Sequence, residues 1–339
     1  MKRTLTLAVT AVMAVGLVAG CGSKPSQTYT PPQSTAPQPT DKPVTLKIGQ
    51  LPIVDGLPFW VAEKNGYYKQ QGVNVELITF KSANERDAAI MGGQIDGMLA
   101  DPIATTTLYA SGTKVQMTAI DLGVTKEEGP IGIVAAPDSG ITDISQLKGV
   151  EIAISNYSMM HYVTEKLLID AGFKPEEIKF INMAAIPVRY ESLLSSKIKA
   201  ATLPDPLLTM ASTQGAKPGK LLVSDVNAKQ NYSQSVIDFS ETAIKQKADG
   251  IKRFYIAYNQ GIADIKAKPQ DYMQLLTEKA NLPAGAAMAF QNGVIPFSFA
   301  QAPNKEEVES VVQWLADKQV IKSKPTYEQL VNSSLLPAK

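Results

Sequence analysis

An internal repeat restricts the fold of this chain more than any other feature of its sequence. Short apolar runs rich in β-branched residues alternate with amphipathic stretches that end in glycine, a pattern typical of βαβ units on a parallel sheet. In the first copy we expect strands at 46–51, 73–80 and 95–100 and helices at 58–66 and 84–93. In the second copy we expect strands at 150–155, 177–183 and 199–204 and helices at 159–172 and 187–197.

The two copies agree in register as well as in order. Arg86 lies nine residues before Ile95, and Arg189 lies nine residues before Ile198. An Asp-Pro pair follows the third expected strand of each copy. Open α/β sheets bind ligands at the carboxyl ends of their strands. A duplicated α/β lobe therefore predicts a ligand cleft where the two sets of loops face each other.

The chain is expected to cross between the lobes twice. A strand, a turn and a short helix at 131–149 are read as the first crossover, and the strand-like run 233–240 as the return. Helices expected at 249–266, 270–280 and 305–319 should pack mainly on the first lobe. The sequence thus predicts that lobe 1 contains residues 44–131 and 238–339 and that lobe 2 contains residues 132–237.

The amino end has the pattern of a signal peptide over residues 1–20, with a positively charged start and an apolar run too short to span a bilayer. The run ends at Val18-Ala19-Gly20-Cys21, which resembles a bacterial lipobox, so we expect Cys21 to carry a lipid such as palmitate. The alternative is an ordinary cleaved signal with an incidental cysteine. Residues 21–43, rich in Ser, Thr, Pro and Gln, should form a disordered tether. The predicted location is the extracytoplasmic face of the cell membrane, by lipid anchor.

Composition excludes several classes of function. A formal net charge of +1 argues against nucleic-acid binding and against electrostatic attachment to a membrane surface. Cys21 is the only cysteine and His161 the only histidine, which excludes disulfides, a Cys/His pair and a zinc cluster of ordinary spacing. The chain has no P-loop, dinucleotide or nucleophile-elbow motif. We expect no catalytic residues, no metal, no cofactor and a monomeric protein.

Several short motifs follow one another between residues 45 and 337. They are Val61-Ala62-Glu63, Gly66-Tyr67-Tyr68-Lys69, Gly72-Val73-Asn74-Val75-Glu76, Gly93-Gln94-Ile95-Asp96-Gly97, Asp138-Ser139-Gly140-Ile141, Leu147-Lys148-Gly149, Pro204-Asp205-Pro206, Tyr327-Glu328-Gln329-Leu330 and Leu335-Leu336-Pro337. In this order they resemble the nitrate/sulfonate/taurine family of periplasmic binding proteins, which includes receptors and an enzyme for the thiamine pyrimidine. The resemblance implies an α/β fold of periplasmic-binding-protein type II, with two α/β lobes joined by two hinge strands, and an ABC permease as membrane partner.

Family position and the repeat both direct the search for ligand-binding residues to the strand-to-helix loops. The candidates are Leu57, Phe59, Trp60, Ser82, Asn84, Arg86, Asp101, Asn156, Tyr157, Ser158, Arg189, Pro204 and Asp205. Asp101 and Asp205 fit equally well as N-caps, because proline at the first helical position follows each of them. Asn156 and Ser158 equally fit as caps of the helix that begins near Met159.

The arginines are informative because only four of the 33 basic residues are arginine. Arg86 and Arg189 stand in the first turn of an expected helix, where a cation opposes the helix dipole. An offsetting negative charge is therefore expected near each of them. It comes either from the protein, with Glu85, Asp87 and Glu191 close in sequence, or from an anionic ligand held by the guanidinium and free helix N–H groups.

Aromatic residues near the predicted cleft also have two interpretations. Phe59, Trp60 and Tyr157 either stack on a flat ligand ring or pack in the core. Met159 either lines the pocket or belongs to the core of its helix. His161 is interpreted as structural, because it lies on a helix beyond the loop.

Together these features predict an extracytoplasmic solute-binding lipoprotein that delivers a small organic molecule or anion to a permease. The resemblance allows nitrate, sulfonates, taurine and thiamine pyrimidines, and the arginine pair with the aromatic loops favours a small aromatic or heteroaromatic acid. The alternative is an enzyme of the same fold related to thiamine-pyrimidine synthesis. Such an enzyme relies on several histidines and a cysteine-rich motif, which this chain lacks. A structural lipoprotein would not account for two facing, duplicated lobes.

Overall fold

The computed structural model describes residues 43–282, 286 and 296–337. The predicted signal peptide at 1–20, the lipidation site Cys21 and the tether up to residue 42 lie outside the described residues. Over those ranges, no helix combines the length and the hydropathy needed to cross a membrane.

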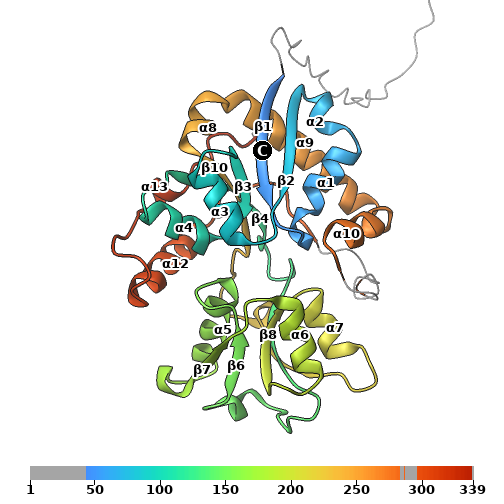
Figure 1. The fold of residues 1–339 in the computed structure, drawn as a ribbon, viewed down its shortest axis with the longest axis vertical. Helices are drawn as coiled ribbons and strands as arrows, with labels where there is room; N and C mark the ends of the chain where they lie inside the picture. Colours follow the sequence, from blue (N-terminus) through green and yellow to red (C-terminus); the bar gives the residue numbers. More distant parts are fainter. Residues whose placement is uncertain (1–42, 283–285, 287–295, 338–339) are drawn as a thin grey trace, which may run out of the picture. The chain divides into compact units, whose positions relative to one another are not determined.

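The strands of the first sheet have the spatial order β2-β1-β3-β10-β4 (Figure 1). Their bounds are β1 Val44–Gln50, β2 Val73–Thr79, β3 Gly97–Ala100, β4 Val115–Leu122 and β10 Ser235–Ser240. β1 pairs in parallel with β2 along its whole length and also with β3, whereas β10 is antiparallel to β3 and to β4. The parallel part agrees with the βαβ pattern of the sequence.

The second sheet has the order β7-β6-β8-β5-β9. Its strands are β5 Ile131–Ala135, β6 Glu151–Ile154, β7 Lys179–Asn182, β8 Ala200–Pro204 and β9 Lys220–Ser224. β6 is parallel to β7 and β8, and β5 is antiparallel to β8 and β9. The two sheets therefore share one topology. In both, the antiparallel strand is the first one that the chain forms after arriving from the other sheet.

The predicted crossovers were wrong in position. The chain passes between the sheets through residues 123–130 and 225–234, because β5 lies wholly in the second sheet and β10 wholly in the first. The sequence interpretation placed the passages at 131–149 and 233–240, since it did not predict β4 and β9. Apolar and polar residues of β4 alternate only from Val115 to Ala119, because the apolar Ile120 follows Ala119 directly, so the alternating run is short.

The helices that flank the first sheet come from both ends of the chain (Figure 1). They are α1 Leu57–Lys64, α2 Tyr67–Gln70, α3 Ala83–Met91, α4 Pro102–Ala110, α8 Glu241–Gln246, α9 Ala248–Ala267, α10 Met273–Lys279, α12 Lys305–Asp317 and α13 Tyr327–Leu330. Single turns of 3-10 helix occur at Val54–Gly56 and Pro269–Tyr272. α9 packs on α1, α2, β1 and β2, so the carboxyl-terminal part of the chain joins the first sheet, as predicted.

The second sheet carries α5 Met159–Asp170, α6 Ile186–Leu194 and α7 Leu207–Thr213. Short 3-10 turns lie at Ile144–Leu147, Pro175–Glu177 and Asp225–Asn227. The predicted helices at 159–172 and 187–197 correspond to α5 and α6, each a few residues shorter than expected.

The central strand β3 of the first sheet is buried on both faces, and its alternate residues enter different cores. In β3, Leu99 belongs to the cluster that contains Phe254 of α9. Met98 belongs to the cluster that contains Ile90 of α3 and Leu108 of α4. Burial of such side chains contributes roughly 1.5–3 kcal/mol each. Helices on both faces hold the sheet, and therefore its strand ends, in place.

Helix α12 packs on α4 and α13 and also against α5 of the second sheet. Val311 and Trp314 share one buried cluster with Met159 and Tyr162. The Tyr162 hydroxyl donates a hydrogen bond to Ser310 Oγ at 2.7 Å. The carboxyl-terminal third of the chain thus contacts both sheets, which the sequence interpretation only partly predicted.

Candidate functional site

The carboxyl ends of the parallel strands carry the residues that the sequence nominates. In the first sheet, Leu57, Phe59 and Trp60 follow β1, Ser82, Asn84 and Arg86 follow β2, and Asp101 follows β3. In the second sheet, Asn156, Tyr157 and Ser158 follow β6, Arg189 lies in α6 after β7, and Pro204 and Asp205 end β8. Parallel neighbours end at the same sheet edge, so each sheet gathers its own candidates along one edge.

Ser82 and Asp101 use their side chains as helix caps. Ser82 Oγ accepts a hydrogen bond from Glu85 N at 3.3 Å at the start of α3. Asp101 Oδ1 accepts from Ile103 N at 2.9 Å and from Ala104 N at 3.0 Å at the start of α4. Burial raises the pKa of Asp101, although these bonds oppose the rise. The capping interpretation of Asp101 is confirmed, and a ligand role remains a prediction.

Arg86 is held entirely by the protein. Its Nε and Nη2 contact Asp87 Oδ1 at 3.0 and 2.7 Å, and Nη1 donates to the carbonyl oxygen of Leu99 at 2.8 Å. The residue is buried, and its charge also lowers the pKa of Asp101 and of Asp238 against the larger effect of their burial. The sequence allowed the charge of Arg86 to be balanced by an acidic side chain or by an anionic ligand, and in the structure Asp87 balances it. Asn84, two residues before Arg86 on the same helix, is exposed.

Arg189 is buried without such an offset. Its Nη1 donates to the carbonyl oxygen of Met183 at 3.0 Å, and its Nε and Nη2 have no hydrogen-bond partner among the described residues. Burial lowers the pKa of Arg189 to about 10, and no acidic residue counteracts this change. The guanidinium therefore stays charged at neutral pH. Two arginines at matching positions of the repeat thus have different surroundings.

α7 begins one residue later than predicted, so Asp205 precedes the N-cap instead of occupying it. Pro206 occupies the N-cap position, and Asp205 Oδ1 accepts from the amide nitrogen of Thr209 at 3.0 Å and from its hydroxyl at 2.7 Å. Burial raises the pKa of Asp205 against these bonds. Pro204 pairs with Ile131 as the last residue of β8.

Leu57, Phe59 and Trp60 are buried in the core of the first sheet. The Phe59 ring lies 5.7 Å from Phe254 and 5.3 Å from Tyr258, so this packing favours the core interpretation of Phe59. Trp60 differs because its Nε1–H is buried and has no acceptor among the described residues. A stacking or donor role for Trp60 stays a prediction.

The loop after β6 exposes an aromatic side chain. Tyr157 has a positive φ of 54° and an exposed ring, and its amide donates to Nδ1 of the buried His161 at 3.1 Å. Ser158 Oγ donates to the carbonyl oxygen of Ser155. The backbone N–H of the exposed Asn156 donates to Oδ1 of Asn182, the last residue of β7. Of the two residues considered as caps of α5, Ser158 occupies the N-cap position, but its side chain makes no capping hydrogen bond.

Sequence reasoning missed a group of buried acids beside these strand ends. Asp121, the penultimate residue of β4, accepts from Tyr258 at 2.6 Å and from Ser235 at 2.9 Å. Burial raises the pKa of Asp55 and raises that of Asp121 well above its ordinary value. The negative charge of Asp55 raises the pKa of Asp121 further, and that of Asp101 raises the pKa of Asp55. An aspartate inside an apolar run, such as Asp121, was the available signal.

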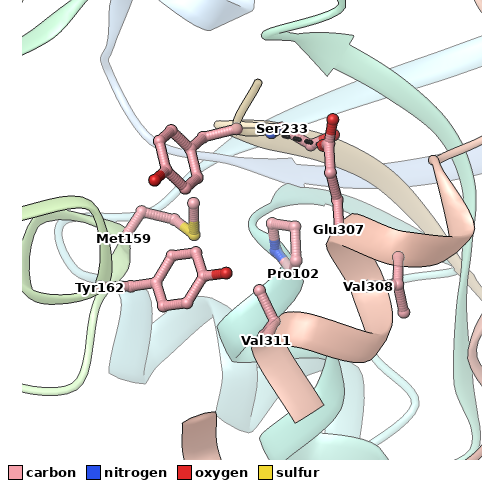
Figure 2. A pocket seen from close by; sticks show the side chains of 8 residues that line it. Pro102, Met159, Tyr162, Ser233, Glu307, Val308 and Val311 are labelled. Atoms are coloured by element: carbon pink, nitrogen blue, oxygen red, sulfur yellow. Dashed lines mark hydrogen bonds between the residues drawn. The ribbon is translucent and has the colours of Figure 1, made fainter. Parts of the chain in front are cut away.

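A small cavity lies where α4, α5, α12 and the second connection meet. Its volume of about 10 Å³ accommodates roughly one water molecule. Figure 2 shows Met159 and Tyr162 of α5 across from Val311, with Ser233 bonded to Glu307 at the rim. Met159 is buried in the cluster with Tyr162 and Val311, which favours the core interpretation, and it lines this water-sized cavity as well. Within the described ranges, no cluster of three or more histidine, cysteine or acidic residues is arranged to hold a metal ion.

Comparison with known proteins places these features in a family context. The model of the NMT1/THI5-like family matches residues 54–272. The riboflavin-binding protein RibY of Chloroflexus aurantiacus is 25% identical over 289 residues, which cover 80% of this chain and 77% of that protein. The 4-amino-5-hydroxymethyl-2-methylpyrimidine phosphate synthase THI11 of Saccharomyces cerevisiae is 28% identical over 169 residues, 48% of this chain and 45% of the yeast protein.

Solved structures show the same fold. The aliphatic sulphonate binding protein SsuA of Escherichia coli has a TM-score of 0.73 at 17% identity and covers 88% of this chain and 95% of its own. The nitrate-binding protein NrtA of Synechocystis has a TM-score of 0.68 at 14% identity and covers 87% of both chains. The chain has the periplasmic-binding-protein fold of ABC import systems, which confirms the predicted fold class.

Proposed function

Because the chain belongs to the NMT1/THI5-like family, we propose that it is the extracytoplasmic solute-binding lipoprotein of an ABC importer. The observation that carries this proposal is the pair of sheets of one topology joined through residues 123–130 and 225–234. Hinge bending at two such connections opens and closes a site formed by strand-end loops. Binding a solute there and releasing it to a permease requires no chemistry on the solute.

The anchoring part of the proposal rests on the sequence. Cys21 would carry the lipid, residues 21–43 would act as the tether, and the protein would work as a monomer beside its permease. With the connections as observed, lobe 1 would comprise residues 44–122 with 235–339, and lobe 2 residues 131–224. The end of the first segment of lobe 1 lies 9 residues earlier than expected from the sequence (122 against 131), and the end of lobe 2 lies 13 residues earlier (224 against 237).

The solute in this proposal is a small organic molecule. The first sheet offers capped helices and buried acids, whereas the second offers an exposed aromatic ring and an unpaired guanidinium. RibY is named for a flavin, and SsuA and NrtA are named for a sulphonate and nitrate. An organic body with an anionic group fits the second sheet best.

An enzyme is the second candidate because yeast relatives are named as pyrimidine phosphate synthases. His161, the only histidine of the chain, is 7% exposed, and its ring lies between Phe180 and Trp314 at 4.7 and 5.0 Å. A side chain packed in this way is poorly placed to act on a substrate, which favours the receptor.

The receptor proposal is tested by a thermal-shift screen of the full chain after denaturation, removal of co-purified ligand and refolding. The panel contains sulfonates, nitrate, pyrimidines, riboflavin and aromatic acids. A solute at a hundred times its Kd stabilises the native state by about 2.7 kcal/mol, and mass spectrometry should recover it unchanged. Consumption of the stabilising compound would favour the enzyme, and no shift with any compound would contradict both.

A further inference from the structure

We propose that the amino end of α6, together with Arg189, binds the anionic end-group of the solute. The inference rests on the proposed receptor function and adds a chemical class to it: a small organic carboxylate or sulfonate. It assigns the charged end of the solute to the second sheet and gives no ligand role to Arg86.

The first observation is an unpaired, buried cation. Arg189 is 0% exposed, and two of its three guanidinium nitrogens have no partner among the described residues. Among the described residues, no carboxyl group affects the pKa of Arg189, which only burial lowers. Residues 283–285 and 287–295, which the structure does not describe, contain no Asp or Glu in the sequence. The protein therefore has no carboxylate in these places to neutralise the charge.

The repeat supplies an internal comparison. Arg86 and Arg189 occupy matching positions, but the next residue is Asp87 in one copy and Tyr190 in the other. Asp87 binds two nitrogens of Arg86. A tyrosine at the same place supplies no negative charge at neutral pH, and partial burial raises the pKa of Tyr190 further. Arg86 therefore has a counter-ion within the protein, whereas the counter-ion of Arg189 would have to be a bound anion.

The second observation is the uncapped start of α6. Helices α3 and α4 begin with capping side chains, whereas the N-cap of α6 is Ala185, which has no polar group. The first-turn N–H groups of a helix lack intrahelical acceptors and carry a partial positive charge. In α6, Pro187 has no N–H, so the free groups of this turn are the amides of Ile186 and Val188. Ala185, Pro187 and Val188 are exposed, so a solute can approach this turn.

The guanidinium and the helix end belong to one place. Arg189 Nη1 is bonded to the carbonyl oxygen of Met183, two residues before the N-cap Ala185. The side chain therefore turns back toward the start of its own helix. Free N–H groups with an adjacent guanidinium form a site that suits a carboxylate or sulfonate. Tyr157, exposed on the neighbouring strand-end loop, offers an aromatic face for the body of the solute.

The test uses Arg189→Met, which keeps an apolar stem and removes the charge. Benzoate and benzenesulfonate are the anionic probes, and benzamide is the uncharged match of benzoate. We expect calorimetry to show a 10- to 100-fold loss of benzoate affinity, with benzamide binding unchanged. The apo variant should melt at the same or a higher temperature, because it no longer buries an unpaired charge. The control is Lys197→Met. Lys197 is an exposed cation just after the end of α6, so its loss should leave benzoate affinity as in the wild type.

Stability separates this role from a structural one. Arg86→Met should lower the melting temperature, since it leaves Asp87 and the buried Asp238 without their cation. A lower melting temperature for Arg189→Met with unchanged benzoate affinity would overturn the proposal. Failure of both anions to bind, while an uncharged compound stabilises the wild type, would refute the anion site and leave the receptor function intact. Absence of binding by every charged and uncharged compound would contradict the receptor function as well.

Discussion

Asp225 Oδ1 accepts a hydrogen bond from the amide nitrogen of Ile131 at 3.0 Å, and this contact joins the two connections between the sheets. Asp225 opens the second connection, and Ile131 follows the first. The other oxygen of Asp225 accepts from Gln234 Nε2 at 3.1 Å, and Glu307 of α12 accepts from the Ser233 amide at 2.9 Å. Carboxyl groups thus fix the geometry of the segments at which the lobes would bend.

The first prediction concerns pH. Burial raises the pKa of Asp225 from 3.8 to about 7, against the opposing effect of its hydrogen bonds. The folded state therefore binds a proton that the unfolded state releases. The contribution of this group is fully present below pH 3.8 and is lost as pH rises to about 7. The upper limit of the loss is about 4 kcal/mol.

Asp225→Asn removes this titration. Urea unfolding between pH 4 and pH 8 should show a flatter dependence of the free energy of unfolding on pH for the variant than for the wild type. Asp138→Asn, which alters an exposed carboxylate paired with Lys217, should reproduce the wild-type curve. Identical slopes for Asp225→Asn and the wild type would contradict the assignment of the titration to Asp225.

The second prediction concerns the contact between α5 and α12. Lys318 Nζ of the α12 end lies 2.7 Å from Glu165 Oε2 of α5. Burial alone would raise the pKa of Glu165, but His161 and Lys318 lower it from 4.5 to about 2. This stabilisation is present above pH 4.5 and is lost as pH falls to about 2. Because the pair is partly solvated, we expect Glu165→Gln to cost about 1–2 kcal/mol at pH 7.

Unfolding measurements at pH 7 and pH 3 check this expectation, and the difference between Glu165→Gln and the wild type should shrink at the lower pH. Glu309→Gln is the matched control, since Glu309 forms an exposed pair with Lys305 at 3.8 Å and should show no measurable effect. A pH-independent difference for Glu165→Gln would mean that packing, not charge, accounts for it.

The sequence predicted the repeated βαβ units because three signals indicate the same elements: the periodicity of the apolar residues, the glycines at the ends of the helices, and the Asp-Pro pair after the third strand of each copy. Every strand and helix of the two copies is present within a few residues of its expected bounds. β4 and β9 were missed because they lie outside the repeated βαβ units on which the prediction was based. β4 pairs with β10, more than a hundred residues later, and pattern alone does not identify such a partner.

For the candidate site, the sequence predicted the loops but not the state of each side chain. Arg86 and Arg189 looked equivalent, and only the packing distinguishes a guanidinium bound to Asp87 from one without a counter-ion. Asp121 was missed because a buried aspartate is recognised by its partners, here Ser235 and Tyr258. Tertiary contacts of this kind depend on residues that are distant in the chain.

The third prediction concerns the loop after β1. A Cβ on Gly56 would lie 2.5 Å from Cζ2 of Trp60, so Gly56→Ala must displace the indole ring. We expect a loss of about 1–3 kcal/mol in the free energy of unfolding, together with weaker binding of any solute that uses Trp60. In the control, Gly92→Ala, the nearest atom is the Ala88 carbonyl oxygen at 3.3 Å, and the loss should be smaller. Equal stability of the two variants would show that the ring yields without cost.

The fourth prediction separates the two roles open to Asp101. Its Oδ1 caps α4 through Ile103 N and Ala104 N, and asparagine caps about as well as aspartate. Because burial raises the pKa of Asp101, removing the charge has no electrostatic penalty. Asp101→Asn should therefore equal or exceed the wild type in stability at pH 7, and Asp101→Ala should lose about 1 kcal/mol.

Urea unfolding gives both values, and calorimetry with the solute found in the thermal-shift screen gives the affinities. If Asp101 only caps the helix, Asp101→Asn binds the solute as the wild type does. A stable Asp101→Asn with weakened binding would instead assign the carboxylate to the solute.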